Sequence, residues 1–174
     1  MATFTNRMLG AARLDRGTYE EVEADTGATG QALGVVVLTG MASGLGLGAG
    51  VTGLVLGTLG TVLGWYVWAF IIYVVGTRWL PERGTRADWG EVLRTVGFAN
   101  APGILRILGV IPVLRALVFF VTGVWVLVAV VIAVRSALDY SSTLRAVGVC
   151  VVGWLIQWLI FGLVATLLGA PPAV

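Results

Sequence analysis

The stretch "GFANAPGILRIL", residues 97–108, interrupts the most apolar half of this 174-residue chain. Within twelve residues it carries two glycines, the amide of Asn100, Pro102 and the charged Arg106. Proline lacks a backbone N–H and clashes with the preceding helical turn, so a helix that contains Pro102 must kink or break there. The way in which the rest of the chain accommodates this break decides the fold.

The composition identifies an integral membrane protein. Hydrophobic residues make up 58% of the chain, charged residues make up only 11%, and the mean hydropathy is +0.96. A water-soluble fold could not bury so much apolar surface. The net charge of +2 comes from eleven arginines, with no lysine or histidine, against nine acids. Because the arginines lie singly between apolar runs, we expect membrane headgroups rather than nucleic acid as their partners.

The apolar runs predict an all-α membrane protein, with a cytoplasmic segment over residues 1–29 and a membrane domain over residues 30–174. If the interrupted stretch is re-entrant, four spans remain. Short interfacial amphipathic helices are expected before the third span and within the first dozen residues, where a solvated tail is the alternative. The preferred arrangement is a bundle of five transmembrane helices at about 30–48, 52–76, 95–113, 116–134 and 146–168.

Glycines recur at close to four-residue spacing along the first two spans. Small residues let helix backbones approach closely in a membrane, so this pattern predicts packing between the two helices. A separate dimerisation face is the alternative. The glycines concerned are Gly40, Gly44, Gly48, Gly53, Gly57, Gly60 and Gly64.

The main hydrophilic connection lies between the second and third spans and ends in an amphipathic pattern. Trp89 and the apolar residues that follow it at helical spacing predict a helix lying on the headgroups. In this helix Glu91 can meet Arg94, three residues further on. Thr85, three residues before Asp88, resembles a capping box that would begin the helix.

Few polar groups lie within the predicted spans. Arg106 cannot remain unpaired in hydrocarbon, at a cost of roughly 3 kcal/mol or more, so we expect it near the outer headgroups, reached by snorkelling. Asn100 could satisfy part of the backbone that Pro102 frees, or bond to another helix. A kinked span with an interfacial arginine is the simplest interpretation. A polar site inside the bundle, with Gln157 as its second member, is the alternative.

No pattern in the sequence predicts catalysis, a cofactor or a metal. Without histidine or lysine, a serine or cysteine nucleophile lacks its usual base, and the single cysteine, Cys150, lies in an apolar run. The acids at positions 20–25 form a solvated charge run without metal-ligand spacing. The glycine-rich "GLGLGAG" lacks the lysine of a phosphate-binding loop. We therefore expect a non-enzymatic protein with no catalytic, cofactor-binding or metal-binding residue.

The arginines also predict the orientation in the membrane. Nine of the eleven lie on the side of the N-terminus in both the five-span and the four-span arrangement, which places that terminus in the cytoplasm. The count does not distinguish the two arrangements. Arginine without lysine, in a chain rich in alanine, valine and glycine, is typical of GC-rich coding and favours a bacterial inner membrane.

Four segments carry a family resemblance. They are "ARLDRGTYEEVEADTGATGQAL" (12–33), "GFANAPGILRIL" (97–108), "IPVLRALVFFVTGVWVLVAVVIAVRSALDY" (111–140) and "STLRAVGVCVVGW" (142–154). In this order they resemble the bacterial branch of the Yip family, integral membrane proteins named for their interaction with Ypt/Rab GTPases. The resemblance implies five spans, a cytoplasmic N-terminus and an exported C-terminus. The chain has no counterpart to the DLYGP-like motif of eukaryotic members, so no GTPase-binding residue is carried over.

These patterns favour a non-enzymatic protein that acts as a scaffold or organises its membrane, as the resemblance to trafficking proteins implies. Two alternatives stay open. The glycine ridges and tryptophans could dock the chain into a larger membrane complex as an accessory subunit. The broken helix could instead mark the route of a small transporter or channel. The expected partners are the lipid bilayer and a homo-oligomer or larger complex.

Overall fold

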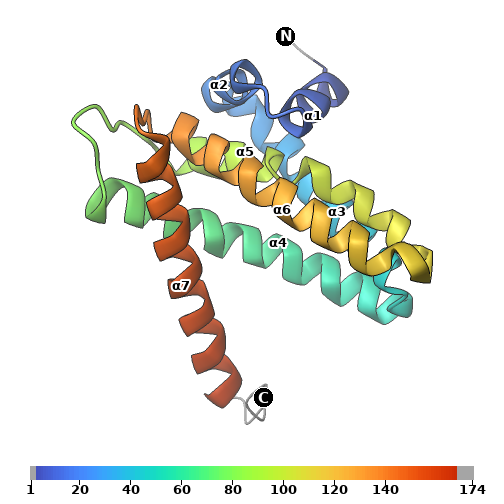
Figure 1. The fold of residues 1–174 in the computed structure, drawn as a ribbon. Coiled ribbons are helices and arrows are strands. Elements are labelled where there is room, and N and C mark those ends of the chain that lie inside the picture. The colour runs from blue at the N-terminus through green and yellow to red at the C-terminus, as the bar shows by residue number, and fades with distance from the viewer. Residues whose placement is uncertain (1–2, 168–174) are drawn as a thin grey trace.

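The computed structural model describes residues 3–167, and every regular element within that range is helical (Figure 1). Segments labelled η are 3₁₀ helices, except η2, which is a single π-helical turn. The elements in chain order are α1 (Phe4–Ala12), α2 (Arg16–Ala24), η1 (Thr26–Ala28), α3 (Thr29–Leu47), α4 (Gly50–Val74), η2 (Val75–Trp79), α5 (Trp89–Phe98), η3 (Ala101–Val110), α6 (Pro112–Ala137) and α7 (Thr143–Leu167).

Four helical stretches within the described residues are long and apolar enough to cross a membrane. They are Thr26–Leu47, Gly50–Trp79, Pro112–Ala137 and Thr143–Val164. They occupy the places of the first, second, fourth and fifth predicted spans. The prediction of an all-α, multi-pass membrane protein is therefore confirmed. The predicted end of the last span at residue 168, and the segment that follows it, lie outside the described residues.

The third predicted span, 95–113, is not one helix. Helix α5 ends at Phe98, and the chain continues from Ala101 as the 3₁₀ helix η3. Pro102 stands in the first turn of η3, where its missing N–H would have no partner within the helix. The α-helical ladder stops here because Pro102 cannot donate to the carbonyl of Phe98.

The segment formed by α5 and η3 runs parallel to α3 and packs along it. The contacting pairs are Gly97 with Ala32, Gly103 with Thr39 and Gly109 with Gly46, each too close for an added Cβ on the first residue to fit without a shift. A 3₁₀ helix rises about 2.0 Å per residue and an α-helix about 1.5 Å. Because η3 rises further per residue, it extends along α3 with fewer residues than an α-helix would need. The glycines permit the close approach of the two backbones.

The glycine ridge of α3 faces α4. A Cβ added at Gly40 would lie 3.0 Å from the Cα of Thr58, and one added at Gly44 would lie 3.0 Å from the Cα of Leu54. These distances leave no room for a side chain, so the two backbones touch through these glycines.

The structure places the other predicted glycines elsewhere. Gly48 ends α3 in the left-handed conformation, with a φ of 67°, and Gly53 lies against Ala49 of its own turn. Leu54 and Thr58 lie on the face of α4 that contacts α3, and the remaining predicted glycines lie on a different face of the helix. That face meets open space and carries Gly57, Gly60 and Gly64.

Helices α1 and α2 form a cap over one end of the bundle (Figure 1). Arg7 is only 2% exposed and pairs with Glu21 at 2.9 Å and with Asp25 at 2.6 Å. It also donates to the amide oxygen of Gln31 on α3, at 3.2 Å. The acids at 20–25 were expected to be a solvated run; two of them instead bind this buried guanidinium, because α1 folds back over α2.

The helix that the sequence predicts at the membrane interface is α5, and it packs beneath the cap. Asp88, rather than Thr85, begins α5 in a capping box with Glu91. Residues 92–99 are all buried, so α5 does not lie on a headgroup surface. Trp89 is half-buried, with its ring 5.7 Å from that of Phe70 on α4.

Arg94 fastens the cap to α5. Its side chain is 4% exposed and donates hydrogen bonds to the backbone carbonyls of Val22 and Glu23 at the end of α2. It therefore satisfies carbonyls that the helix end leaves without partners, rather than meeting Glu91 as expected. Arg94 thereby joins α5 to the end of α2.

We predict that Gly46→Ala destabilises the protein and that Gly60→Ala does not. A Cβ at Gly46 would overlap the carbonyl oxygen of Arg106, a backbone atom that cannot turn away, whereas Gly60 faces open space. Overpacking of this kind costs about 1–3 kcal/mol. Gly60→Ala gains up to about 1 kcal/mol from helix propensity.

The measurement is thermal unfolding in mild detergent, where each kcal/mol shifts the midpoint by about 2–4 °C. Equal midpoints for the two variants would contradict the close packing of η3 on α3.

Candidate functional site

Helix α7 packs on the bundle near its beginning and then diverges from it (Figure 1). Ala146 and Val149 are buried, and Gly153 contacts Ile71 and Ile72 of α4. Beyond Gly153 most side chains of the helix are exposed. The small residue lets α7 cross α4 closely, so the two helices separate on the far side of the crossing.

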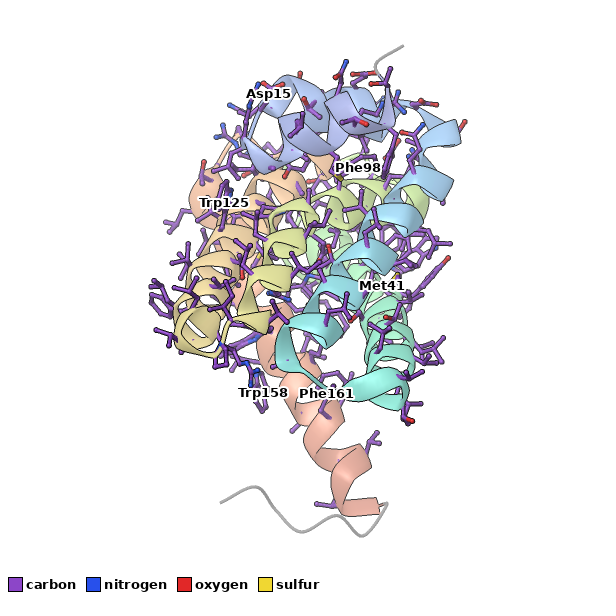
Figure 2. All side chains as sticks on the ribbon, turned by 90° about the vertical axis from the view of Figure 1, so that its right-hand side faces the viewer. Asp15, Met41, Phe98, Trp125, Trp158 and Phe161 are labelled. Carbon is purple, nitrogen blue, oxygen red and sulfur yellow. The ribbon has the colours of Figure 1, made fainter. Side chains whose placement is uncertain are left out.

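A groove of about 790 Å³ lies between α7, α4 and α6, with Val96 and Asn100 of the broken segment at its base. Its walls are almost entirely apolar and aromatic. Figure 2 shows two of its residues, Trp158 and Phe161, on α7 toward the end opposite Asp15 of the cap. The tryptophans that line the groove are Trp65, Trp68, Trp154 and Trp158.

The groove brings together the two amides that the sequence analysis paired. Asn100 lies at the base of the groove and Gln157 lies on α7. Both are half-buried, and Gln157 has no hydrogen-bond partner among the described residues. Arg106 and Pro102 do not line this groove.

Asn100 also forms hydrogen bonds on both sides of the break between α5 and η3. Its side-chain amide nitrogen donates to the backbone carbonyl of Val96 at 2.9 Å, and its backbone carbonyl accepts from Gly103 N at 2.8 Å. The same carbonyl accepts from Thr39 Oγ1 of α3 at 3.0 Å. Groups of the protein itself therefore satisfy the backbone at the break.

Arg106, the charged residue of the interrupted stretch, lies apart from the amides of Asn100 and Gln157, between α3 and α6. Its Nε donates to Thr122 Oγ1 at 3.3 Å and its Nη1 to Ser43 Oγ at 3.4 Å. The guanidinium lies over the ring of Phe119, 5.7 Å from the centroid. The polar residues of the interrupted stretch therefore lie in two places, Asn100 in the groove and Arg106 between α3 and α6.

A second hollow, of about 510 Å³, lies at the capped end, between α2 and the junction of α6 with α7. Its charged lining residues are Arg16, Glu20, Glu23, Arg135 and Asp139. Sequence reasoning did not single out this hollow, because its members lie more than a hundred residues apart and share no spacing pattern.

Glu23 is the perturbed acid of this hollow. Burial raises its pKa from the ordinary 4.5 to about 7, and the negative charges of Asp139, Glu91 and Glu20 act in the same direction. A hydrogen bond from Ser136 Oγ, at 3.1 Å, opposes the rise. The carboxyl therefore holds its proton close to neutral pH.

We predict that the wild-type protein loses stability as the pH rises from 4.5 to about 7 and that Glu23→Gln removes this loss. In this range the folded state keeps a proton on Glu23 that the unfolded state has released, so the free energy of unfolding falls with rising pH. Thermal unfolding of both proteins across this range measures the difference. Parallel curves would contradict the raised pKa.

We predict that Asn100→Leu lowers the free energy of unfolding by about 1–3 kcal/mol, because the Val96 carbonyl loses its donor. Gln157→Leu serves as the control, since it removes an amide of the same groove that has no partner among the described residues. Its effect should stay within about 0.5 kcal/mol. Denaturation in detergent compares the two. A neutral Asn100→Leu would show that the break does not need the side chain.

The sequence matches the family model of the Yip1 domain over residues 23–166. No curated protein and no solved structure matches the chain. The matched region begins at the end of α2 and includes the broken segment, the groove and nearly all of α7. The resemblance to this family is thereby confirmed, and the chain belongs to the Yip1 domain family.

Proposed function

We propose that this multi-pass membrane protein is a non-enzymatic scaffold that organises its membrane by association with a second copy of itself. The observation that carries the proposal is the groove between α4, α6 and α7. Exposed apolar residues are ordinary in a membrane, but a groove lined by four tryptophans is a more specific feature. Helices associate in lipid mainly through close van der Waals packing, and a groove supplies the area for it.

The groove also offers anchors for such a contact. Trp154, Trp158 and Phe161 are 55%, 62% and 54% exposed, and they line one wall. Large aromatic side chains bury the most area when a partner covers them. Gln157, between them in sequence, can donate to a facing helix.

We further propose five traverses in a bacterial inner membrane, with the N-terminus in the cytoplasm and α7 ending on the exported side. The parallel packing of α5 and η3 along α3 supports the fifth traverse. Ten α-helical residues and ten 3₁₀ residues extend about 35 Å together, compared with about 30 Å of hydrocarbon. The excess of arginine on the side of the cap supports the orientation.

Two other functions remain candidates. An accessory subunit would use the same groove for a different protein. A small transporter is favoured by the two amides in the groove, since broken helices often form substrate sites. All nine acids, however, lie in or near the cap and the connections at its end, at positions 15–25, 82–91 and 139. Coupling to a cation would therefore lack a carrier within the spans.

The test is extraction of the tagged protein from its host in mild detergent, followed by native-gel sizing and mass spectrometry. We expect a homo-oligomer that Trp158→Ala shifts to the protomer. Trp79→Ala is the matched control, because both tryptophans are 62% exposed and only Trp158 lines the groove.

A protomer at every concentration, or equal effects of the two variants, would contradict self-association. A stoichiometric partner of different sequence would overturn the scaffold in favour of the accessory subunit. Solute flux into liposomes that depends on Gln157 would favour the transporter.

A further inference from the structure

The charges of this chain are separated along the bundle. The acids gather at the capped end, where α3 begins and α4 and α6 end. At the opposite end α3 finishes, η3 finishes and α6 begins, and two arginines lie there, Arg106 on η3 and Arg115 on α6. No aspartate or glutamate side chain of residues 3–167 lies near them, so no acidic side chain in the described part of the chain balances their charge.

Arg106 is held in place by its backbone. The carbonyl of Arg106 packs directly on Gly46 of α3, and Phe119 of α6 lies against both Gly46 and Gly109. The backbone of Arg106 therefore packs directly on α3. Its half-buried side chain lies between two apolar helices.

The partners of the Arg106 guanidinium are weak. The hydroxyls of Ser43 and Thr122 accept from it at 3.4 and 3.3 Å, which is long for a charged donor. Both hydroxyls already donate to carbonyls of their own helices, at 2.8 and 2.7 Å. Neutral acceptors at these distances do not balance a full positive charge in an apolar setting.

Arg115 extends the positive region toward the end of the bundle. Its Nε donates to the carbonyl of Gly109 at 3.1 Å, and its Nη2 lies beside Gly48, where an added Cβ would come within 3.6 Å. Its two terminal nitrogens have no acceptor among the described residues. The absence of a side chain at Gly48 leaves that approach open.

The elements that carry the two arginines also carry exposed apolar side chains. Ile107, Val110 and Val113 are 45%, 61% and 90% exposed. A ligand that fits this place carries a negative head for the guanidinium groups and an apolar chain for the surrounding surface. A free anion would leave the apolar surface uncovered.

We propose that Arg106 and Arg115 bind the phosphate of an anionic phospholipid in the leaflet opposite the cap. Guanidinium groups present several donors in a plane, which suits the oxygens of a phosphate. The acyl chains of the lipid lie along the exposed side chains of η3 and the first turns of α6. The site is distinct from the groove, and it holds whether or not the chain self-associates.

The test uses the full chain, purified in detergent and exchanged with phosphatidylglycerol or phosphatidylcholine. Native mass spectrometry counts the lipid that stays bound. We expect wild type to retain phosphatidylglycerol preferentially, with a loss of about fivefold for each arginine removed in Arg106→Gln and Arg115→Gln. Arg78→Gln is the control, because Arg78 is an exposed arginine at the other end of the bundle, and it should retain the lipid like wild type.

The outcomes separate the sources of the phosphate. Inorganic phosphate that stabilises the protein against heat as well as phosphatidylglycerol does would overturn the assignment to a lipid. Equal retention of both lipids by wild type would overturn the site, as would equal losses in Arg78→Gln and in a variant that carries both Arg106→Gln and Arg115→Gln. Arg115→Gln, which removes only one bond to a backbone carbonyl, keeps the test valid if Arg106→Gln does not fold.

Discussion

A break in a helix that packs inside an apolar bundle leaves backbone groups that the protein itself must satisfy, and the fold of this chain accommodates one such break between α5 and η3. The side chain of Asn100 replaces the backbone donor to Val96, and Thr39 of α3 reaches across to the Asn100 carbonyl. This second bond ties the break to a neighbouring helix. The close contacts of α3 with the broken segment at Gly46, Gly97 and Gly103 are consistent with this bond, because they keep Thr39 within reach of the break.

The arginines at the two ends of the bundle have different kinds of partner. At the capped end each buried guanidinium has close partners: Arg7 binds two carboxylates, and Arg94 binds the last carbonyls of α2. Burial of a charge is tolerable there because the partners come with it. The hydrogen bond from Arg7 also holds the pKa of Asp25 below its usual range. Arg106, at the far end, is half-buried, and its contacts among the described residues are two hydroxyl groups and the ring of Phe119.

The sequence predicts some of this and misses other parts for definite physical reasons. Hydropathy locates the four long helices, because each long apolar run can be recognised without knowing its neighbours. The pattern after Trp89 predicts a helix, but an apolar face looks the same whether it meets lipid or the cap, so the burial of α5 was missed. The acceptors of Arg94 are backbone carbonyls, which no spacing of side chains reveals. The groove is visible only in the structure, although its two amides, Asn100 and Gln157, stand out in the sequence as rare polar groups.

The groove exists because α7 is fastened firmly at one end only. Glu82 accepts hydrogen bonds from Ser141 and Ser142 just before α7, and these donors hold its pKa below the usual range. Tyr140 donates to the carbonyls of Gly76 in η2 and of Leu80 just after it, so the start of α7 is joined to the segment that follows α4 by polar bonds. Past Gly153 the contacts are few and apolar. A helix fixed by directional bonds at its start and crossing its neighbour at a glycine must diverge beyond that crossing. The open groove is thus set by the polar junction at the capped end.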